Sequence, residues 1–308
     1  MISLAVAVAA CGGGGDGGAG EAAGGGAIKR NADNAKTTLT IGSKNFTEQQ
    51  VLGQIYAQGL QAAGYTVKTK LNLGDENIAH DALKSGQIDA YPEYTGTALL
   101  SFFGKKSSEL PKDPEQAYDQ AKQAFAAEGL VALPPTPFTS SNEVAVTSDT
   151  ADRLGLSTIS DLSGQAKKLT LAGSPECRHR QDCLLGLEQV YGLHFKRFIE
   201  VEIPHRHDVL TSGRADVSIV FTTDPQIKRN NEVLLEDDKG MLPPYNSTLV
   251  VRKQAADAAG ADLQSTVEQI NTGLTDETMQ ELNARVDLDH QDPAAVAKGY
   301  LRQAGLVK

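Results

Sequence analysis

The sequence predicts an α/β protein with two lobes and a ligand cleft between them, on three observations. Strand-like and helix-like patterns alternate from about residue 38 onward, which is typical of parallel sheets with helices on both faces. Two proline-rich segments, 133–146 and 240–251, each run into an apolar strand and suit crossings between lobes. The 308 residues are enough for two domains with buried cores.

The elements at the start of this alternation have the clearest patterns. "TTLTIGSKN" begins with a strand at about 38–42, and a helix follows in "TEQQVLGQIYAQGLQAAG". Thr47 and Gln50 form a capping-box pattern at the start of this helix, and Gly64 suits the position after its end. "YTVKTKLNL" predicts a second strand, "ENIAHDALKSG" a second helix that Gly86 closes, and "IDAY" a third strand.

The alternation continues to about residue 220, and the last sixty residues have mainly helical patterns. We expect further helices at 113–128, 181–191 and 206–213, and further strands at 130–133, 143–147, 168–172, 198–202 and 216–220. Two crossings mean that one lobe is built from both ends of the chain. We therefore place lobe 1 at 38–140 and 246–308, and lobe 2, as an insertion, at 141–245.

The N-terminal segment has the pattern of an export signal. Residues 1–11 read "MISLAVAVAAC", an apolar run that ends in small residues and a cysteine, although no Lys or Arg precedes it. The "VAAC" ending resembles a bacterial lipobox, in which Cys11 becomes the lipidated first residue. Residues 12–37 would then be a Gly-rich flexible tether. We expect an extracytoplasmic protein, lipid-anchored to the bacterial cell membrane; the alternative is a disordered tail with a stray cysteine.

Charge and motif content exclude several classes of function. The net charge of −10 disfavours nucleic acid as a partner, because binding it requires a basic face. No run of 18 apolar residues is present to span a membrane. The sequence contains no GxSxG, HExxH or P-loop motif, and the serine of "GSPE" (173–176) has no assignable histidine partner. We therefore expect no enzyme, no cofactor and no metal.

The two remaining cysteines lie close together in "CRHRQDC". In an oxidising compartment, Cys177 and Cys183 are most simply a disulfide that stiffens a loop. A metal site that includes His179 is the alternative, but a fourth ligand is lacking and the spacing fits no zinc knuckle.

Three predicted strands end in polar or aromatic residues. Ligands of open α/β sheets bind beyond the carboxyl ends of the strands, so the cleft is the expected site. "GSKN", "YPEYTGT" and "FTTD" directly follow strands, and they contribute Lys44, Tyr91, Tyr94, Thr97, Phe221 and Asp224.

Several motifs of the chain together resemble those of a known family. "IGSKNFTEQ", "AHDALKSGQIDAYPEYTGTAL", "FTTD", "LEDDKGMLPPY" and "VAKGYL" together look like the substrate-binding proteins of osmoprotectant ABC importers, which take glycine betaine, choline, carnitine or proline betaine. The resemblance runs from about residue 38 to the end. It implies a type II periplasmic-binding-protein fold that closes on its ligand. It also implies an aromatic cage for the quaternary ammonium, with basic and hydroxyl groups for the carboxylate.

The family pattern carries over to seven positions. Lys44 and Arg180 match basic residues that hold the ligand's carboxylate, and Thr97 matches a hydroxyl donor. Aromatic walls of the cage are implied at Tyr94, Phe221 and Tyr245, although the family usually has tyrosine where Phe221 stands. Asn142 stands where many relatives carry another tyrosine, and an amide has no π-face.

Several of these aromatic and polar residues also have a purely structural interpretation. Phe221 ends an apolar strand and suits the core equally well. Tyr91 points away from the side of Tyr94, and Glu93 suits bonding to the backbone of the turn. His205 and His207, in "PHRHD", suit a polar helix start rather than metal ligands.

The function implied is that of an extracytoplasmic substrate-binding component of an ABC importer. It would capture a quaternary-ammonium osmoprotectant such as glycine betaine and deliver it to the permease and ATPase subunits, as a monomer. Two alternatives remain open. The same fold could bind a larger or flatter molecule, because Asn142 replaces one aromatic wall, or the chain could be a ligand-sensing lipoprotein.

Overall fold

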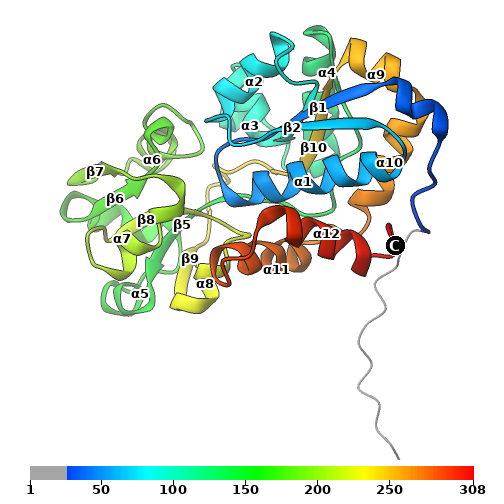
Figure 1. The fold of residues 1–308 in the computed structure, drawn as a ribbon. Coiled ribbons are helices and arrows are strands. Elements are labelled where there is room, and N and C mark those ends of the chain that lie inside the picture. Colours follow the sequence, from blue (N-terminus) through cyan, green and yellow to red (C-terminus); the bar gives the residue numbers. More distant parts are fainter. Residues whose placement is uncertain (1–25) are drawn as a thin grey trace, which may run out of the picture.

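The computed structural model describes residues 26–308 (Figure 1). The expected signal segment 1–11, with Cys11, lies outside the described residues. The expected tether 12–37 is too long at its C-terminal end, because Ala32–Lys36 form a short 3-10 helix. The backbone N–H of Ile28 donates to Leu306 at 3.0 Å, so this stretch is fixed against the C-terminal end of the chain.

Two five-stranded sheets form the framework of the molecule. The first sheet has the order β2-β1-β3-β10-β4, and the second has the order β7-β6-β8-β5-β9. The first sheet consists of β1 (Thr38–Gly42), β2 (Thr66–Lys70), β3 (Ala90–Tyr94), β4 (Leu130–Ala132) and β10 (Ser247–Arg252). The second consists of β5 (Asn142–Thr147), β6 (Thr170–Gly173), β7 (Arg197–Glu200), β8 (Val217–Phe221) and β9 (Glu232–Leu235).

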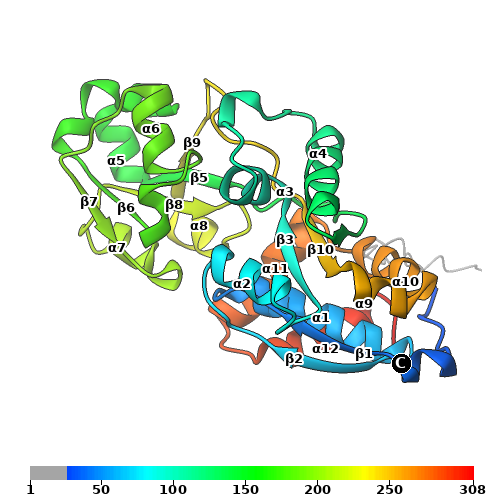
Figure 2. The same cartoon turned by 90° about the horizontal axis from the view of Figure 1, so that it is seen from above.

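Helices cover both faces of each sheet, as the alternation predicted. The elements of the first sheet form lobe 1 with α1 (Thr47–Ala62), α2 (Glu76–Lys84), α3 (Thr95–Thr97), α4 (Pro114–Ala127), α9 (Lys253–Ala259), α10 (Ala261–Asn271), α11 (Asp276–Asp287) and α12 (Pro293–Gln303). Lobe 2 adds α5 (Ser148–Leu154), α6 (Leu184–Tyr191), α7 (Asp208–Thr211) and α8 (Pro225–Asn230) to the second sheet. Figure 2 shows the two lobes side by side.

The core of lobe 1 is divided by its sheet. Tyr94 packs with α1, α10, α11 and α12 on one face, and Tyr91 packs with α2 and α4 on the other. Side chains of a strand point alternately to its two faces, so residues three apart separate in this way. Tyr91 is fully buried and does not line the cleft described below, which agrees with its structural interpretation.

Both sheets are mixed, whereas the alternation of strands and helices predicted parallel ones. β10 runs antiparallel to β3 and β4, and β5 runs antiparallel to β8 and β9. These are the two strands that follow a crossing. The chain leaves β4 and β9 at the edge that faces the other lobe and enters the next sheet at that same edge. β5 and β10 must therefore run away from the cleft while their neighbours run toward it.

The two crossings are the segments 133–141 and 236–246. They contain the proline-rich stretches, and together they connect the lobes (Figure 2). The expected lobe boundaries, at residues 140 and 245, fall within these segments and stay predictions.

The local structure around α1 and β3 differs from the sequence pattern. Helix α1 begins at Thr47, and its N-cap is Phe46 without a side-chain bond, so the predicted capping box is wrong. The Thr47 hydroxyl instead donates to Asp287 of α11 at 2.5 Å. "YPEY" is not a turn after a strand: β3 includes it, and the helix α3 begins at Thr95. The elements α3, α5, α8 and β9 had no clear sequence signal.

Gly96, in "YTGT", lies against the second crossing. A Cβ built on Gly96 would stand 2.7 Å from the backbone oxygen of Pro244 and 2.8 Å from Cγ of Pro243. Only a residue without a side chain lets the end of β3 approach the crossing so closely. This close approach places Tyr94 and Tyr245, on either side of Gly96, at the same cleft.

We expect Gly96→Ala to lower the free energy of unfolding by about 1–3 kcal/mol, because the added methyl group meets backbone that cannot move aside. Denaturant unfolding followed by circular dichroism measures the change. Gly164→Ala is the matched control, since a Cβ at Gly164 meets no atom within 4 Å. Equal stability of the two variants would contradict the close packing at Gly96.

Candidate functional site

A cavity of about 690 Å³, part of it open to solvent, lies between the lobes. The strand topology explains its position. Lys44 follows β1, Tyr94 ends β3, and Phe221 ends β8, while Asn142 opens β5. All seven ligand-binding residues predicted from the sequence line this cavity: Lys44, Tyr94, Thr97, Asn142, Arg180, Phe221 and Tyr245. Further residues at the site, among them Phe46, Glu76, Asp182 and Arg206, were not singled out by the motifs quoted above.

Three aromatic rings form one corner of the cavity. The centroid of the Phe46 ring lies 6.4 Å from that of Tyr94 and 5.3 Å from that of Phe221. Phe46 belongs to lobe 1 and Phe221 to lobe 2, so this contact joins the lobes. Phe221 both lines the cavity and packs on the core of lobe 1, so its interpretation as a core residue is confirmed and its role as a cage wall stays a prediction. Phe46 could have been found, since it lies two residues after Lys44 in "GSKNF".

Lys44 is buried and already paired. Its ammonium donates to Glu93 at 2.5 Å and lies 4.5 Å from the centroid of the Tyr94 ring. Glu93 is fully buried and also accepts hydrogen bonds from the backbone N–H of Tyr94 and the hydroxyl of Tyr91. Glu93 therefore has the structural role expected of it. It also leaves Lys44 without a spare charge for a ligand's carboxylate.

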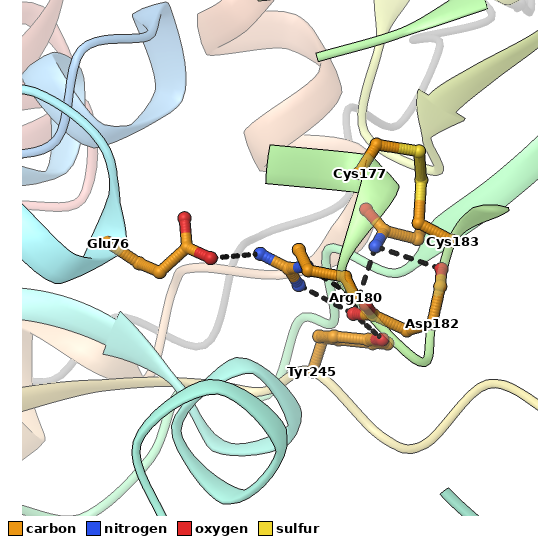
Figure 3. Close-up of a disulfide and its surroundings, with 7 residues drawn as sticks. Glu76, Cys177, Arg180, Asp182, Cys183 and Tyr245 are labelled. Atoms are coloured by element: carbon orange, nitrogen blue, oxygen red, sulfur yellow. Dashed lines mark hydrogen bonds and ion pairs between the residues drawn. A yellow bond between two sulfur atoms is a disulfide. The ribbon is translucent and has the colours of Figure 1, made fainter. Parts of the chain in front are cut away.

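Asp182 lies at the centre of a second buried network (Figure 3). Arg180 donates to its carboxylate through Nε at 2.9 Å and through a terminal nitrogen at 2.5 Å. The hydroxyl of Tyr245 donates to it at 2.5 Å, and the amide of Asn142 donates at 3.0 Å. Burial opposes ionisation of Asp182, but Arg180 and these hydrogen bonds hold the pKa of its carboxyl below the usual range. Asp182 is therefore a permanent buried anion.

Arg180 also reaches across the cleft. Its other terminal nitrogen donates to Glu76, the first residue of α2 in lobe 1, at 2.9 Å (Figure 3). Burial disfavours the charged form of Glu76, and the Arg180 guanidinium, with help from Lys44, keeps the pKa of this carboxyl below its ordinary value. Glu76 is 4% exposed, so the ion pair is largely shielded from water.

The disulfide between Cys177 and Cys183 forms as expected and holds this network in place. The loop that it closes contains both Arg180 and Asp182 (Figure 3). Both cysteines are buried, and their Cα atoms are 5.2 Å apart. In the chain-entropy model, closing a loop of this length stabilises the protein by about 2 kcal/mol. The disulfide thus also limits where the Arg180 side chain can lie.

A third charged cluster lies behind Phe221. The guanidinium carbon of Arg206 is 3.6 Å from the centroid of the Phe221 ring, and Arg206 donates to Asp224 at 2.6 Å. His207 lies 2.9 Å from Asp224 through Nε2 and 2.7 Å from Glu232 through Nδ1. Both ring nitrogens thus face carboxylate oxygens, which only the protonated imidazolium satisfies fully.

His207 is the N-cap residue of α7, as the expectation of a polar helix start implied, and it is in addition a buried ionic partner. His205 is exposed, as expected. Within residues 26–308, no group of three or more His, Cys, Asp or Glu side chains could hold a metal ion. In the same range, no helix has the length and apolar character needed to cross a membrane.

Known proteins share both the sequence and the fold. The family model for the substrate-binding domain of ABC-type glycine betaine transport systems matches residues 37–303. A glycine-betaine-binding protein of Pseudomonas aeruginosa is 35% identical over 281 residues, which cover 88% of this chain and 89% of that protein. The ergothioneine transport permease/ergothioneine binding protein EgtU of Helicobacter pylori is 30% identical over 281 residues, 91% of this chain and 50% of that protein. The crystal structure of a glycine betaine/carnitine/choline ABC transporter protein, 25% identical, has a TM-score of 0.69 and covers 86% of this chain and 98% of that one.

Two mixed sheets with a lined cleft between them define a two-lobed substrate-binding protein of the transport type, not an enzyme. The chain belongs to the family of substrate-binding domains of ABC-type glycine betaine transport systems. Its homologues are extracytoplasmic, and proteins of this kind bind small ligands and deliver them to a permease. The resemblance and the fold class predicted from the sequence are confirmed.

The cluster around His207 should make stability depend on pH. Burial opposes protonation, but the hydrogen bonds to Asp224 and Glu232 outweigh it and raise the pKa of His207 above 6.5. A raised pKa in the folded state contributes stability that is fully present below pH 6.5 and is lost as the pH rises through the folded pKa. We expect the wild type to lose unfolding free energy as the pH rises. The loss should be about 1.4 kcal/mol for each pH unit by which the pKa of His207 in the folded protein exceeds 6.5.

Urea unfolding at a pH below 6.5 and at pH about 9 measures this loss in the wild type, in His207→Gln and in the control His205→Gln. His205 is the natural control because it is exposed and makes only a 3.4 Å contact with Asp208. We expect His205→Gln to keep the wild-type dependence and His207→Gln to lose it. An identical dependence in all three proteins would contradict the ionic role of His207.

Proposed function

We propose that this chain captures a quaternary-ammonium osmoprotectant such as glycine betaine for an ABC importer. The aromatic corner formed by Phe46, Tyr94 and Phe221 carries the proposal. A trimethylammonium group has no N–H to donate, so size, charge and aromatic faces are the means of recognising it. Each face within about 6 Å contributes on the order of 0.5–2 kcal/mol.

The position of Lys44 supports this use of the corner. Its ammonium lies 4.5 Å from the Tyr94 centroid and 5.9 Å from the Phe46 centroid, so both rings can face a cation. Glu93 pairs with this ammonium, which lowers its repulsion of a second cation nearby. The lining also contains the carboxylates of Asp75, Glu76 and Glu176. The lining contains as many cations, Lys44, Arg180 and Arg206, but each of these is paired with a buried carboxylate, so the lining carboxylates favour a cationic group over an isolated anion.

We further propose how the ligand is oriented. Tyr94, Phe221 and Tyr245 would form the walls around the ammonium, and Thr97 and Arg180 would face the carboxylate of a betaine. Lys44 would join them only by giving up part of its pairing with Glu93. The ring of Tyr245 is buried, with its hydroxyl bonded to Asp182, so its face rather than its oxygen is available. Lobe closure around the ligand would follow from the hinge role of the two crossings.

A larger or flatter betaine is the second candidate ligand, and Asn142 is the observation that favours it. Asn142 lines the cavity and gives its amide to Asp182, where an aromatic side chain would add a wall. The relative from Helicobacter pylori that is named for ergothioneine binding makes this candidate concrete.

Calorimetric titration tests the function directly. The ligands are glycine betaine, choline, carnitine and ergothioneine, with the uncharged carbon isostere of choline, in which tert-butyl replaces trimethylammonium, as the control. We expect at least one quaternary ammonium compound to bind and the isostere not to bind. Equal binding of choline and its isostere would contradict a cation cage, and the strongest ligand distinguishes the two candidates.

Phe46→Leu should weaken quaternary-ammonium binding by roughly 2- to 30-fold, because leucine keeps an apolar side chain but removes one aromatic face. Phe102→Leu is the matched control, since Phe102 stacks on His80 in lobe 1 and does not line the cavity. The same calorimetric titration compares the two variants. If both lose affinity equally, Phe46 acts through stability and not as a wall of the site.

For the partners, we propose a permease and ATPase subunits, with the binding protein as a monomer. For the location, we propose attachment to the outer face of the bacterial membrane through a lipid on Cys11. The lipobox-like "VAAC" and the Gly-rich stretch after it support this location. A tethered binding protein stays near its permease, which raises the effective concentration of the loaded form.

Cys11→Ser should release the protein from the membrane fraction without unfolding it, because serine has no thiol to accept the lipid. Fractionation of cells followed by immunodetection measures the release. Ser3→Ala, in the same segment, is the control and should leave the protein with the membrane. A Cys11→Ser protein that still sediments with the membrane would contradict the lipid anchor.

A further inference from the structure

The guanidinium of Arg180 has almost no donor left for a ligand. Of its five N–H groups, those on Nε and on one terminal nitrogen bind Asp182, with Thr97 at 3.5 Å as a further weak partner. The other terminal nitrogen binds Glu76 at 2.9 Å. Four of the five N–H groups are thus used, so a ligand's carboxylate that needs two parallel donors must displace one of these partners.

The two carboxylates that occupy Arg180 differ in how firmly they are held. Asp182 is fixed, because Tyr245 and Asn142 also donate to it and its side chain is completely buried. Glu76 accepts one other side-chain bond, from Ser101 at 3.3 Å, and comes from the opposite lobe. If one partner of Arg180 yields to a ligand, it is Glu76.

The charges around the cavity also indicate that Glu76 is the partner of Arg180 that a ligand can displace. Lys44, Arg180 and Arg206 each have a buried partner of their own, which are Glu93, Asp182 and Asp224. Glu76 is an additional carboxylate on an arginine that is already neutralised. It stays ionised, because its carboxyl pKa lies below the ordinary value against the opposition of burial. The site thus supplies the anion that a betaine would otherwise bring.

We propose that Glu76 is a specificity-determining residue, whose carboxylate occupies the anion position at Arg180. A carboxylate-bearing betaine must displace Glu76, whereas choline, which lacks a carboxylate, binds with the pair intact. This inference rests on the proposed quaternary-ammonium function and refines its ligand preference. Glu76 thereby lowers the affinity for glycine betaine relative to that for choline.

The same pair also connects the lobes. Among the residues 26–308, Glu76–Arg180 is the one ion pair that joins lobe 1 to lobe 2. It is buried, so water and salt screen it little. The ion pair therefore contributes to the junction between the lobes, beside the Phe46–Phe221 contact and hydrogen bonds such as Asn283 to Thr223, and its loss has an effect that does not depend on any ligand.

Calorimetric titration of glycine betaine and of choline into wild type, Glu76→Gln and Asp81→Asn tests the preference. Asp81 lies on the same helix, is exposed and does not line the cavity, so its variant removes an equal charge outside the site. We expect Glu76→Gln to raise the ratio of glycine betaine to choline affinity about tenfold, with Asp81→Asn at the wild-type ratio. An unchanged ratio in Glu76→Gln, or an equal change in both variants, overturns the proposal.

A ligand-free measurement separates this proposal from the proposed function. If no quaternary ammonium compound binds any of the proteins, the proposed function fails, and solution scattering then decides on Glu76. Loss of the pair should give Glu76→Gln a larger ligand-free radius of gyration than wild type and Asp81→Asn, which supports the interlobe contact. An unchanged radius overturns it. Glu76→Ala, which also removes the carboxylate, takes its place if Glu76→Gln does not fold.

Discussion

The buried carboxylate of Asp182 is the interaction on which the cleft depends. It joins three segments far apart in the chain: the disulfide loop through Arg180, the start of β5 through Asn142, and the second crossing through Tyr245. Removing a single partner from a buried ion pair leaves an uncompensated charge, which is commonly worth about 3–5 kcal/mol. The same contacts that position the binding residues therefore also fix the junction between the lobes.

Much of the fold and of the site could be predicted because both follow from strand ends. Residues that follow a strand running toward the cleft lie at the cleft. "GSKN" and "FTTD" are examples, since they place Lys44 and Phe221 on the lining. The direction of the strands that follow a crossing could not be read from any local sequence pattern. The strands that follow a crossing enter their sheet from the cleft side, and this puts Asn142 and Tyr245, at or just before their first residues, beside the residues at the ends of the others.

The pairing of charges could not be predicted from the sequence. Lys44 and Glu93 are 49 residues apart, and Arg180 and Glu76 are 104 residues apart, so no spacing rule connects them. The sequence motifs identify Lys44 and Arg180 as cations but do not show whether their charges are free for a ligand. The structure shows that each has an internal carboxylate. A family motif identifies residue types at a site, but it does not show which of their hydrogen bonds are already used.

This pairing determines what kind of ligand the cleft can select. Internal carboxylates neutralise the buried cations. A free anion therefore gains little from Lys44 or Arg180 unless it displaces one of these carboxylates. A quaternary ammonium group competes for none of these hydrogen bonds, because it has no proton to donate. It gains from the aromatic faces and from the carboxylates on the lining, because the cations on the same lining already have buried partners. The chemistry of the cleft therefore makes recognition of the ammonium primary and recognition of a ligand's carboxylate secondary.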